Sequence, residues 1–137
     1  MRSFYFDTSI WLDFFEDRGL PNLPKSKWAT KLIEKIIKED SRIIYSDINE
    51  EELMEQGYTD YELEDLFQPL KKILIHTEAT RRQLGKARDI ASRRNIPTRD
   101  ALHALIARDR KATLVTLDRH FQKIKDIIGS KRPQDLI

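Results

Sequence analysis

Short apolar runs that alternate with helix-like stretches constrain the fold of this chain more than any other feature of its sequence. Such runs occupy residues 4–6, 42–46, 73–75 and 113–116. They are continuously apolar rather than alternating, which is typical of parallel strands buried on both faces. Strands connected through helices in this way form right-handed crossovers. The sequence therefore predicts an α/β fold, a three-layer α/β/α domain around a central parallel sheet of four to five strands.

The stretches between these runs have the periodicity and the terminal residues of helices. Apolar residues spaced by three and four predict a helix over residues 27–40. Thr59 and Glu62 have the pattern of a capping box for a helix that ends near residue 68. Further helices are expected over 10–16 with Thr8 or Ser9 as the cap, over 49–56, over 77–94, and after residue 97 with Thr98 as the cap. A short edge strand is expected near Ile127, and residues 1–137 are expected to form one domain because no linker or repeat divides them.

The composition excludes several classes of protein. Cysteine is absent, which rules out a disulfide framework, thiolate metal sites and a cysteine nucleophile. No apolar run reaches the roughly 18 residues of a membrane span, and the N-terminus lacks the pattern of a signal peptide. We therefore expect a cytoplasmic protein without membrane contact. Charged residues make up 35% of the chain, the formal net charge is +2, and arginines concentrate between residues 81 and 111, which permits binding to a nucleic acid.

Four carboxylates fall near the ends of these predicted elements: Asp7, Glu52, Asp100 and Asp118. Ligands of open α/β sheets bind beside the carboxyl ends of the strands, where Asp7 and Asp118 are placed. Carboxylates that gather at one edge repel one another, so they need raised pKa values or a cation, and hard oxygen ligands suit Mg²⁺ or Mn²⁺. Each acid alone also fits an ordinary role as a strand end, a turn residue or part of a solvated helix face. The joint placement carries the prediction.

Four sequence blocks together resemble the PIN-domain nucleases, and among them the VapC-type toxins. The first is FYFDTS at residues 4–9, and the second runs from Ser46 to Glu52-Leu53 six positions later. The third is PTRDALHA at residues 97–104, in which an Asp-Ala pair opens a helix, and the fourth is LVTLDRHF at residues 114–121. The blocks have the order and spacing of that family from the first predicted strand almost to the C-terminus.

The resemblance implies which residues act. Asp7, Glu52, Asp100 and Asp118 match the four acidic positions, which are expected to bind Mg²⁺ or Mn²⁺. Asp7 and Asp100 are expected to contact the ion directly, whereas Glu52 and Asp118 are expected to bind it either directly or through its waters. Glu51 stays an alternative to Glu52 because one sequence does not fix the register. The hydroxyls of Thr8, Ser9 and Thr116 are expected to orient the carboxylates or water. His120 stands where many relatives carry a further Asp, which puts a second metal site in doubt; for His103 and His120 we favour packed or hydrogen-bonded roles over metal ligation.

The resemblance further implies a cytoplasmic ribonuclease that hydrolyses RNA phosphodiester bonds, the toxin of a toxin–antitoxin pair. A stand-alone RNA-processing nuclease and a non-catalytic PIN-like module that binds RNA or protein are the alternatives. A phosphatase of the haloacid-dehalogenase type also begins with Asp after an apolar strand, but it needs a second Asp where this chain has Ser9. Candidate contacts to the RNA backbone are Arg81, Arg82 and Arg99, with Arg88, Arg93, Arg94 and Arg108 as further arginines that a solvated helix face explains equally well.

Two protein partners are expected on the same grounds, a second copy of the chain and an antitoxin. Trp11, Phe14, Phe15 and Trp28 exceed what one small core needs, although core packing is an equal explanation. We expect the antitoxin groove along the helices over residues 10–16, 27–40 and 59–68. A basic side chain there would compete with the metal for the carboxylates.

Overall fold

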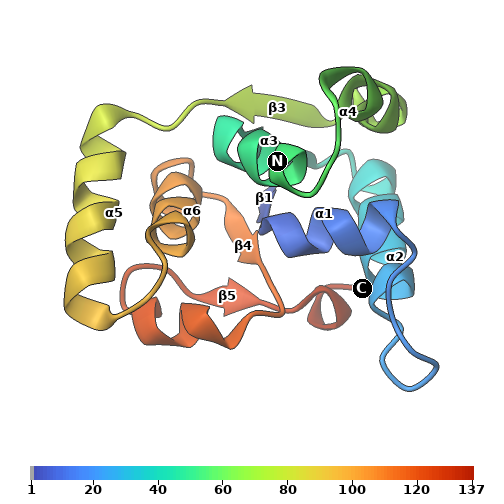
Figure 1. Cartoon of the computed structure of the whole chain (residues 1–137). Coiled ribbons are helices and arrows are strands. Elements are labelled where there is room, and N and C mark those ends of the chain that lie inside the picture. The colour runs from blue at the N-terminus through green and yellow to red at the C-terminus, as the bar shows by residue number, and fades with distance from the viewer. Residues whose placement is uncertain (1) are drawn as a thin grey trace.

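A five-stranded parallel sheet forms the centre of the fold in the computed structural model, which describes residues 2–137 (Figure 1). The strands are β1 (Ser3–Phe6), β2 (Arg42–Ser46), β3 (Leu74–Thr77), β4 (Thr113–Val115) and β5 (Ser130–Lys131). Their order in the sheet is β3-β2-β1-β4-β5. Because every neighbouring pair is parallel, the carboxyl ends of all five strands meet at one edge of the sheet.

Helices cover both faces of this sheet. They are α1 (Thr8–Phe15), α2 (Lys25–Lys38), α3 (Asp47–Glu55), α4 (Asp60–Phe67), α5 (Arg81–Arg94) and α6 (Thr98–Asp109), with short 3-10 helices η1 (Gln68–Leu70), η2 (Arg119–Ile124) and η3 (Pro133–Asp135). In Figure 1, α1 and α2 lie on one side of the sheet while α5 and α6 lie on the other. None of the helices in the described chain combines the length and the apolar character that crossing a membrane requires.

Two apolar cores hold these layers together, and the strands supply both. In β1, Phe4 and Phe6 join the core shared with α1, α2 and α4, whereas Tyr5 between them joins the core shared with α5 and α6. Ile43 and Ile44 in β2 divide in the same way. Since successive side chains of a strand point to opposite faces, continuously apolar strands require cover on both sides. The predicted three-layer α/β/α fold is confirmed.

The starts of several helices differ from the sequence prediction. Helices α2 and α3 each begin two residues earlier than predicted, at Lys25 and at Asp47. Asp7 is the N-cap residue of α1, so Thr8 and Ser9 lie inside the helix rather than capping it. Helix α5 begins at Arg81 with a capping box from Thr80, not at Thr77, because Thr77 pairs with Ser46 and continues β3.

The capping box predicted from Thr59 and Glu62 is confirmed. The cap predicted at Thr98 and the edge strand predicted near Ile127 need correction. Thr98 is the first residue of α6 rather than its cap, since Pro97 occupies the N-cap position. The edge strand lies at Ser130–Lys131 and not near Ile127, whose side chain packs against the core on the α6 face.

The aromatic residues that seemed surplus to the core have divided roles. Trp11 is fully buried, with its ring centroid 5.0 Å from that of Phe6 and 5.0 Å from that of Phe67. Phe14 and Phe15 pack against the same core and are partly buried, and Trp28 is partly buried as well. Core packing therefore accounts for Trp11, which is the only one of these four side chains that is fully buried.

Candidate metal centre and active site

The four predicted acids come from four separate elements along the carboxyl edge of the sheet. Asp7 directly follows β1, and its backbone N–H donates to the carbonyl of Val115 at 3.0 Å, which continues the sheet pairing by one residue. Asp118 follows β4, Glu52 lies in α3, and Asp100 lies in the first turn of α6.

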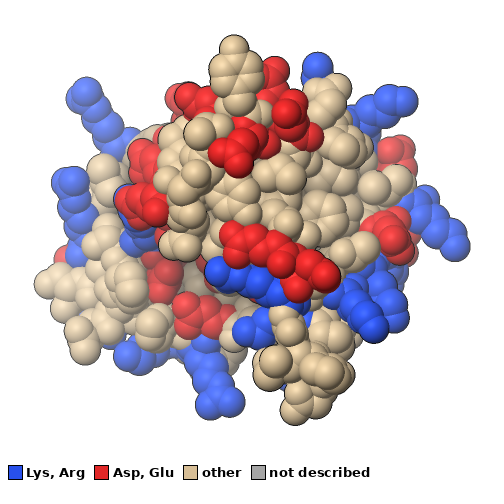
Figure 2. Space-filling view, turned by 45° about the vertical axis from the view of Figure 1, so that its right-hand side comes forward, with Lys and Arg blue, Asp and Glu red and all other residues tan. Residues whose placement is uncertain are grey.

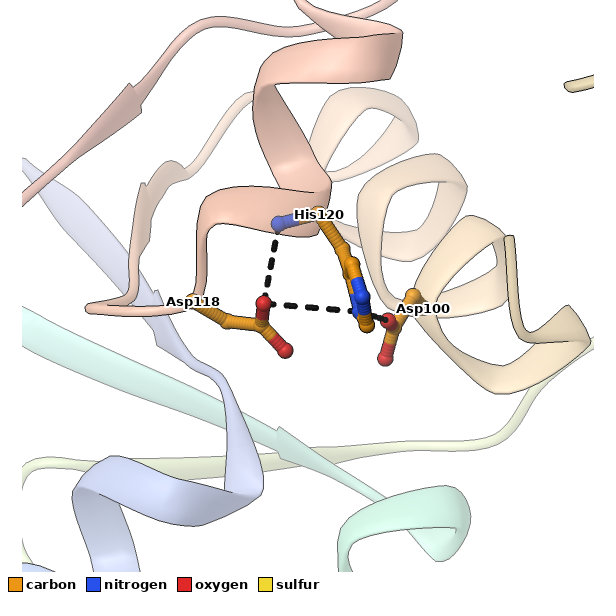
Figure 3. A group of neighbouring side chains, drawn as sticks. All are labelled: Asp100, Asp118 and His120. Atoms are coloured by element: carbon orange, nitrogen blue, oxygen red, sulfur yellow. Dashed lines mark hydrogen bonds and ion pairs between the residues drawn. The ribbon is translucent and has the colours of Figure 1, made fainter. Parts of the chain in front are cut away.

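Asp100, Asp118 and His120 form the tightest group of possible metal ligands. One ligand atom from each lies within 4.8 Å of the other two. Figure 3 shows the three side chains converging from α6, the loop after β4 and the start of η2. The Nδ1 atom of His120 lies 3.3 Å from Oδ2 of Asp100 and 3.5 Å from Oδ1 of Asp118. The backbone N–H of His120 also donates to Oδ1 of Asp118 at 2.8 Å, which fixes that carboxylate.

Asp7 is buried beside this group and is held by two hydroxyl donors. Its Oδ2 atom accepts hydrogen bonds from Ser9 Oγ and from Thr116 Oγ1, each at 2.9 Å. Thr116 Oγ1 in turn accepts the backbone N–H of Asp118 at 3.0 Å. The hydroxyl of Thr116 thus connects Asp7 to the loop that carries Asp118. Ser9 and Thr116 thus both donate to the carboxylate of Asp7, while their role in orienting it toward a metal ion stays a prediction.

Glu52 belongs to a second hydrogen-bonded group on the same edge. Its Oε1 atom accepts from Thr8 Oγ1 at 2.7 Å and contacts Nε2 of His103. Thr8 is itself held by Asn49, whose Nδ2 atom donates to Thr8 Oγ1 at 2.9 Å and to the carbonyl of Phe6 at 3.2 Å. Both hydrogen bonds to Glu52 fall on Oε1, so the position of the carboxylate is fixed through one oxygen atom.

His103 anchors Glu52 to the interior of the molecule. The imidazole is fully buried, and its Nδ1 lies 2.6 Å from the hydroxyl of Tyr5, which lies 2.7 Å from Oγ of Ser46. Burial alone would lower the pKa of His103, but the hydrogen bond and charge of Glu52 outweigh burial and raise it. For Glu52, burial is likewise opposed by His103, and the net result is a lowered pKa. His103 is thus hydrogen-bonded in the interior, the role favoured for it from the sequence.

Asp100 has the opposite electrostatics. Burial, followed by the negative charges of Asp7 and Asp118, raises its pKa to about 6. Among the residues that the structure describes, His120 is the only one that forms a side-chain hydrogen bond with the Asp100 carboxylate, at 3.3 Å. A cation among these three acids would relieve the repulsion and favour the ionised form.

Glu51, the alternative to Glu52, points away from this centre. Its side chain is 57% exposed and lies 3.9 Å from Arg99. Arg99 makes a two-fold contact with Glu55 at 2.6 and 2.7 Å, so this candidate for RNA binding is already paired. Arg81 and Arg82 are exposed at the start of α5.

Residues for which the sequence analysis assigned no role in the site complete the centre. Tyr5, Ser46 and Asn49 form the buried hydrogen bonds behind Glu52 and Thr8. A signal was present for Asn49, which stands three residues after Ser46 at a strand-to-helix junction, where it completes a capping box. His120 is hydrogen-bonded to Asp100, one of the two roles favoured for it from the sequence. It is not packed, since its side chain is 51% exposed, and its Nδ1 atom lies among possible ligand atoms.

The chemistry of these donors fits a small divalent cation. Carboxylate oxygens from Asp7, Asp100 and Asp118 are the ligands that Mg²⁺ and Mn²⁺ prefer. The single imidazole nitrogen of His120 is accepted more readily by a transition-metal ion such as Mn²⁺ than by Mg²⁺. The residues present are therefore compatible with the metal expected from the sequence.

Comparisons with known proteins agree with the fold. The chain shares its fold with a toxin–antitoxin complex from Klebsiella pneumoniae (17% identity, TM-score 0.68, covering 95% of this chain and 97% of that one). It also resembles VapBC2 from Rickettsia felis, solved bound to a DNA fragment from the VapBC2 promoter (18% identity, TM-score 0.65, covering 93% of this chain and 95% of that one). A third similar structure is PAE2754 from Pyrobaculum aerophilum (16% identity, TM-score 0.58, covering 99% of this chain and 86% of that one). No curated protein matches the sequence. A family model described as the PIN domain matches residues 4–127, and the protein therefore belongs to the PIN-domain family of nucleases.

Proposed function

We propose that this protein is an endoribonuclease that hydrolyses RNA phosphodiester bonds with Mg²⁺ or Mn²⁺. The observation that carries the proposal is the convergence of Asp100, Asp118 and His120 beside the buried carboxylate of Asp7. Three carboxylates that lie close together at the carboxyl edge of a parallel sheet repel one another, and a cation bound between them and the imidazole would remove that repulsion.

The residues divide the work between binding and orientation. When bound, the ion supplies Lewis-acid polarisation of the phosphate and a source of hydroxide near neutral pH. Asp7 and Asp100 would hold it directly, with Asp118 and His120 completing the donor set. Ser9 and Thr116 keep the Asp7 carboxylate in one orientation. Glu52, fixed through Oε1 by Thr8 and His103, leaves its other oxygen to orient water at the phosphate.

Cleavage of matched nucleic acids tests this proposal. Purified protein should cut single-stranded RNA in the presence of Mg²⁺ or Mn²⁺, lose the activity in excess chelator, and leave DNA of the same sequence intact. Asp7→Asn and Asp100→Asn should abolish cleavage, whereas Glu51→Gln, which alters an exposed acid outside the centre, should retain it. Full cleavage in chelator, or wild-type rates in both Asn variants, would contradict the proposal.

We further propose that the protein is the toxin of a toxin–antitoxin pair and forms homodimers. Two solved structures that share its fold are described as a toxin–antitoxin complex and as VapBC2. Helix α4 carries four acids and no base within its eight residues. In the view of Figure 2, acidic side chains gather at the top of the molecule, where α4 comes forward. A hollow of about 370 Å³ between α4 and β3 has apolar walls from Tyr45 and Phe67 and acids at Glu50 and Glu64.

This surface suits a partner segment that presents apolar and basic side chains together. Co-expression with a small neighbouring open reading frame, followed by sedimentation, should give a complex that cleaves less RNA than the isolated chain. A strict monomer that copurifies with no small protein would favour the second candidate, a stand-alone RNA-processing nuclease. The phosphatase alternative requires a second acid at the position that Ser9 occupies, and the Ser9 hydroxyl there donates a hydrogen bond to Asp7.

A further inference from the structure

A hollow of about 400 Å³ adjoins the metal centre on the side of β4 and β5. Asp118 and Thr116 line it together with Arg119, Gln122 and Arg132. We propose that this hollow, which we call the β5 pocket, binds the nucleotide next to the scissile phosphate. The inference rests on the proposed ribonuclease function and adds to it the place where the RNA strand leaves the centre.

The sheet order places the β5 pocket directly beside the carboxylates. Strand β1, which leads to Asp7, pairs with β4, which pairs with β5. The loop after β4 carries both Asp118 and the hydroxyl of Thr116 that holds Asp7. The same loop forms one wall of the pocket, so a phosphate at the metal centre would have its neighbouring nucleotide over the pocket.

Charge also favours an RNA strand at this position. The charged residues that line the pocket are two arginines, Arg119 and Arg132, and two aspartates, Asp118 and Asp135. The basic excess lies around it, since residues 119–132 contain five bases and one acid, Asp126, a formal charge of +4 with His120 neutral. Asp126 is paired with Arg94 from α5. Arg119 is exposed and forms no ion pair with any residue that the structure describes. Arg132 contacts Asp135 and yet keeps 61% of its side chain exposed.

The pocket also has the parts needed to contact a base. Leu23 and Leu117 provide apolar surface, and the carboxamide of Gln122 offers both a donor and an acceptor. Arginines that contact phosphate give affinity without reading sequence, whereas a carboxamide beside a base contributes preference. Arg119 and Arg132 are therefore assigned to the backbone and Gln122 to the base.

A second hollow, on the opposite side of the centre, contains two of the three arginines favoured from the sequence, Arg81 and Arg99. It has a volume of about 480 Å³ and is lined by Arg81, Arg88 and Arg99. None of the four acids of the centre lines it. The β5 pocket is the better assignment because it shares Asp118 with the centre.

RNA binding measured apart from cleavage tests the assignment. Fluorescence anisotropy of a short fluorescein-labelled single-stranded RNA, with Ca²⁺ in place of Mg²⁺ and the RNA checked for integrity on a gel, reports affinity. Arg119→Ala and Arg132→Ala should each weaken binding about three- to tenfold near physiological salt and reduce the slope of log K against log salt by about 0.7. Gln122→Ala should change the ratio of affinities for oligouridine and oligoadenosine but not the salt slope.

Arg110→Ala is the matched control. Arg110 is an exposed arginine at the C-terminal end of α6, next to the start of β4 and thus at the opposite edge of the sheet. Its loss should leave both affinity and salt slope unchanged. Equal weakening in all three arginine variants would mean a general charge effect and would overturn the assignment, as would unchanged binding in both pocket variants. The two proposals can fail separately. If only the pocket variants lose RNA binding, but the wild-type protein does not cleave RNA with any of the metal ions, the pocket assignment stands and the ribonuclease function is refuted.

Discussion

Replacing Asp100 with Asn should make the metal-free protein more stable. Burial and the charges of Asp7 and Asp118 raise the pKa of Asp100 to about 6, whereas its ordinary value is 3.8. Because the folded state then binds the proton more tightly than the unfolded state, the ionised carboxylate opposes folding. One pKa unit corresponds to about 1.4 kcal/mol, so the cost is about 3 kcal/mol near pH 7.5 and about 1 kcal/mol near pH 4.5.

The sign of the pH dependence follows from this difference. As the pH rises from about 4 to about 6, the wild-type protein loses stability at this position, and above that range the loss is complete. Asn at residue 100 keeps a polar group beside His120 without the charge. It should recover about 2–3 kcal/mol near pH 7.5, which for 137 residues raises the melting temperature by about 7–10 °C.

Thermal unfolding in chelator, followed by circular dichroism at both pH values, measures the effect. Taking the difference between Asp100→Asn and wild type at each pH cancels the titration of all groups that do not interact with residue 100. The advantage should be about threefold larger near pH 7.5 than near pH 4.5. Mg²⁺ should then stabilise the wild type more than the variant, because binding to the folded state adds stability. Asp65→Asn, which removes an exposed charge from α4, should change little at either pH. A variant less stable than wild type, or an advantage independent of pH, would refute the reasoning.

Three further changes have defined outcomes. His120→Asp should raise the affinity for Mg²⁺ relative to Mn²⁺, because an oxygen replaces the imidazole nitrogen; an unchanged ratio of the ion-dependent shifts in melting temperature would exclude His120 as a ligand. Thr116→Val removes the hydroxyl between Asp7 and Asp118, so it should cost about 1–3 kcal/mol of unfolding free energy and reduce RNA cleavage at least about tenfold, and wild-type cleavage would contradict that linking role. Thr59→Ala breaks the capping box of α4 and should cost about 1 kcal/mol in urea unfolding with cleavage unchanged; a loss of cleavage would place α4 in the catalytic reaction.

The layers of the fold were predictable from the sequence because they depend on local composition. Continuous apolar runs determine that the strands are buried on both faces, and parallel strands bring their carboxyl ends to one edge. That rule is enough to place Asp7 and Asp118 beside each other. Helix starts were less predictable because they depend on pairing. Thr77 resembles a helix cap until β3 is paired with β2, which extends the strand through that residue.

The choice between Glu51 and Glu52 shows where sequence reasoning stops. Asn49 and Leu53 are both fully buried, four residues apart on one face of α3. Glu52 is three residues from Asn49 and so lies near that face, whereas Glu51 is turned toward solvent. The burial of a polar residue such as Asn49 was the missing information, and it depends on Ser46, Thr8 and Phe6, which are distant in sequence or outside the helix.

The contrast between Glu52 and Asp100 indicates how one edge of the sheet can hold several acids in different states. Glu52 accepts hydrogen bonds from Thr8 and His103, and its pKa is lowered. Asp100 has one weak contact at 3.3 Å, and its pKa is raised. A carboxylate that accepts hydrogen bonds from the protein remains charged without a cation, whereas the ionised form of a carboxylate with few such bonds is stabilised most by a bound cation. The hydrogen bonds from Thr8 and His103 therefore keep Glu52 ionised, whereas the ionised form of Asp100 depends on a bound cation. The metal-free protein is less stable for this reason, and the Asp100→Asn variant measures by how much.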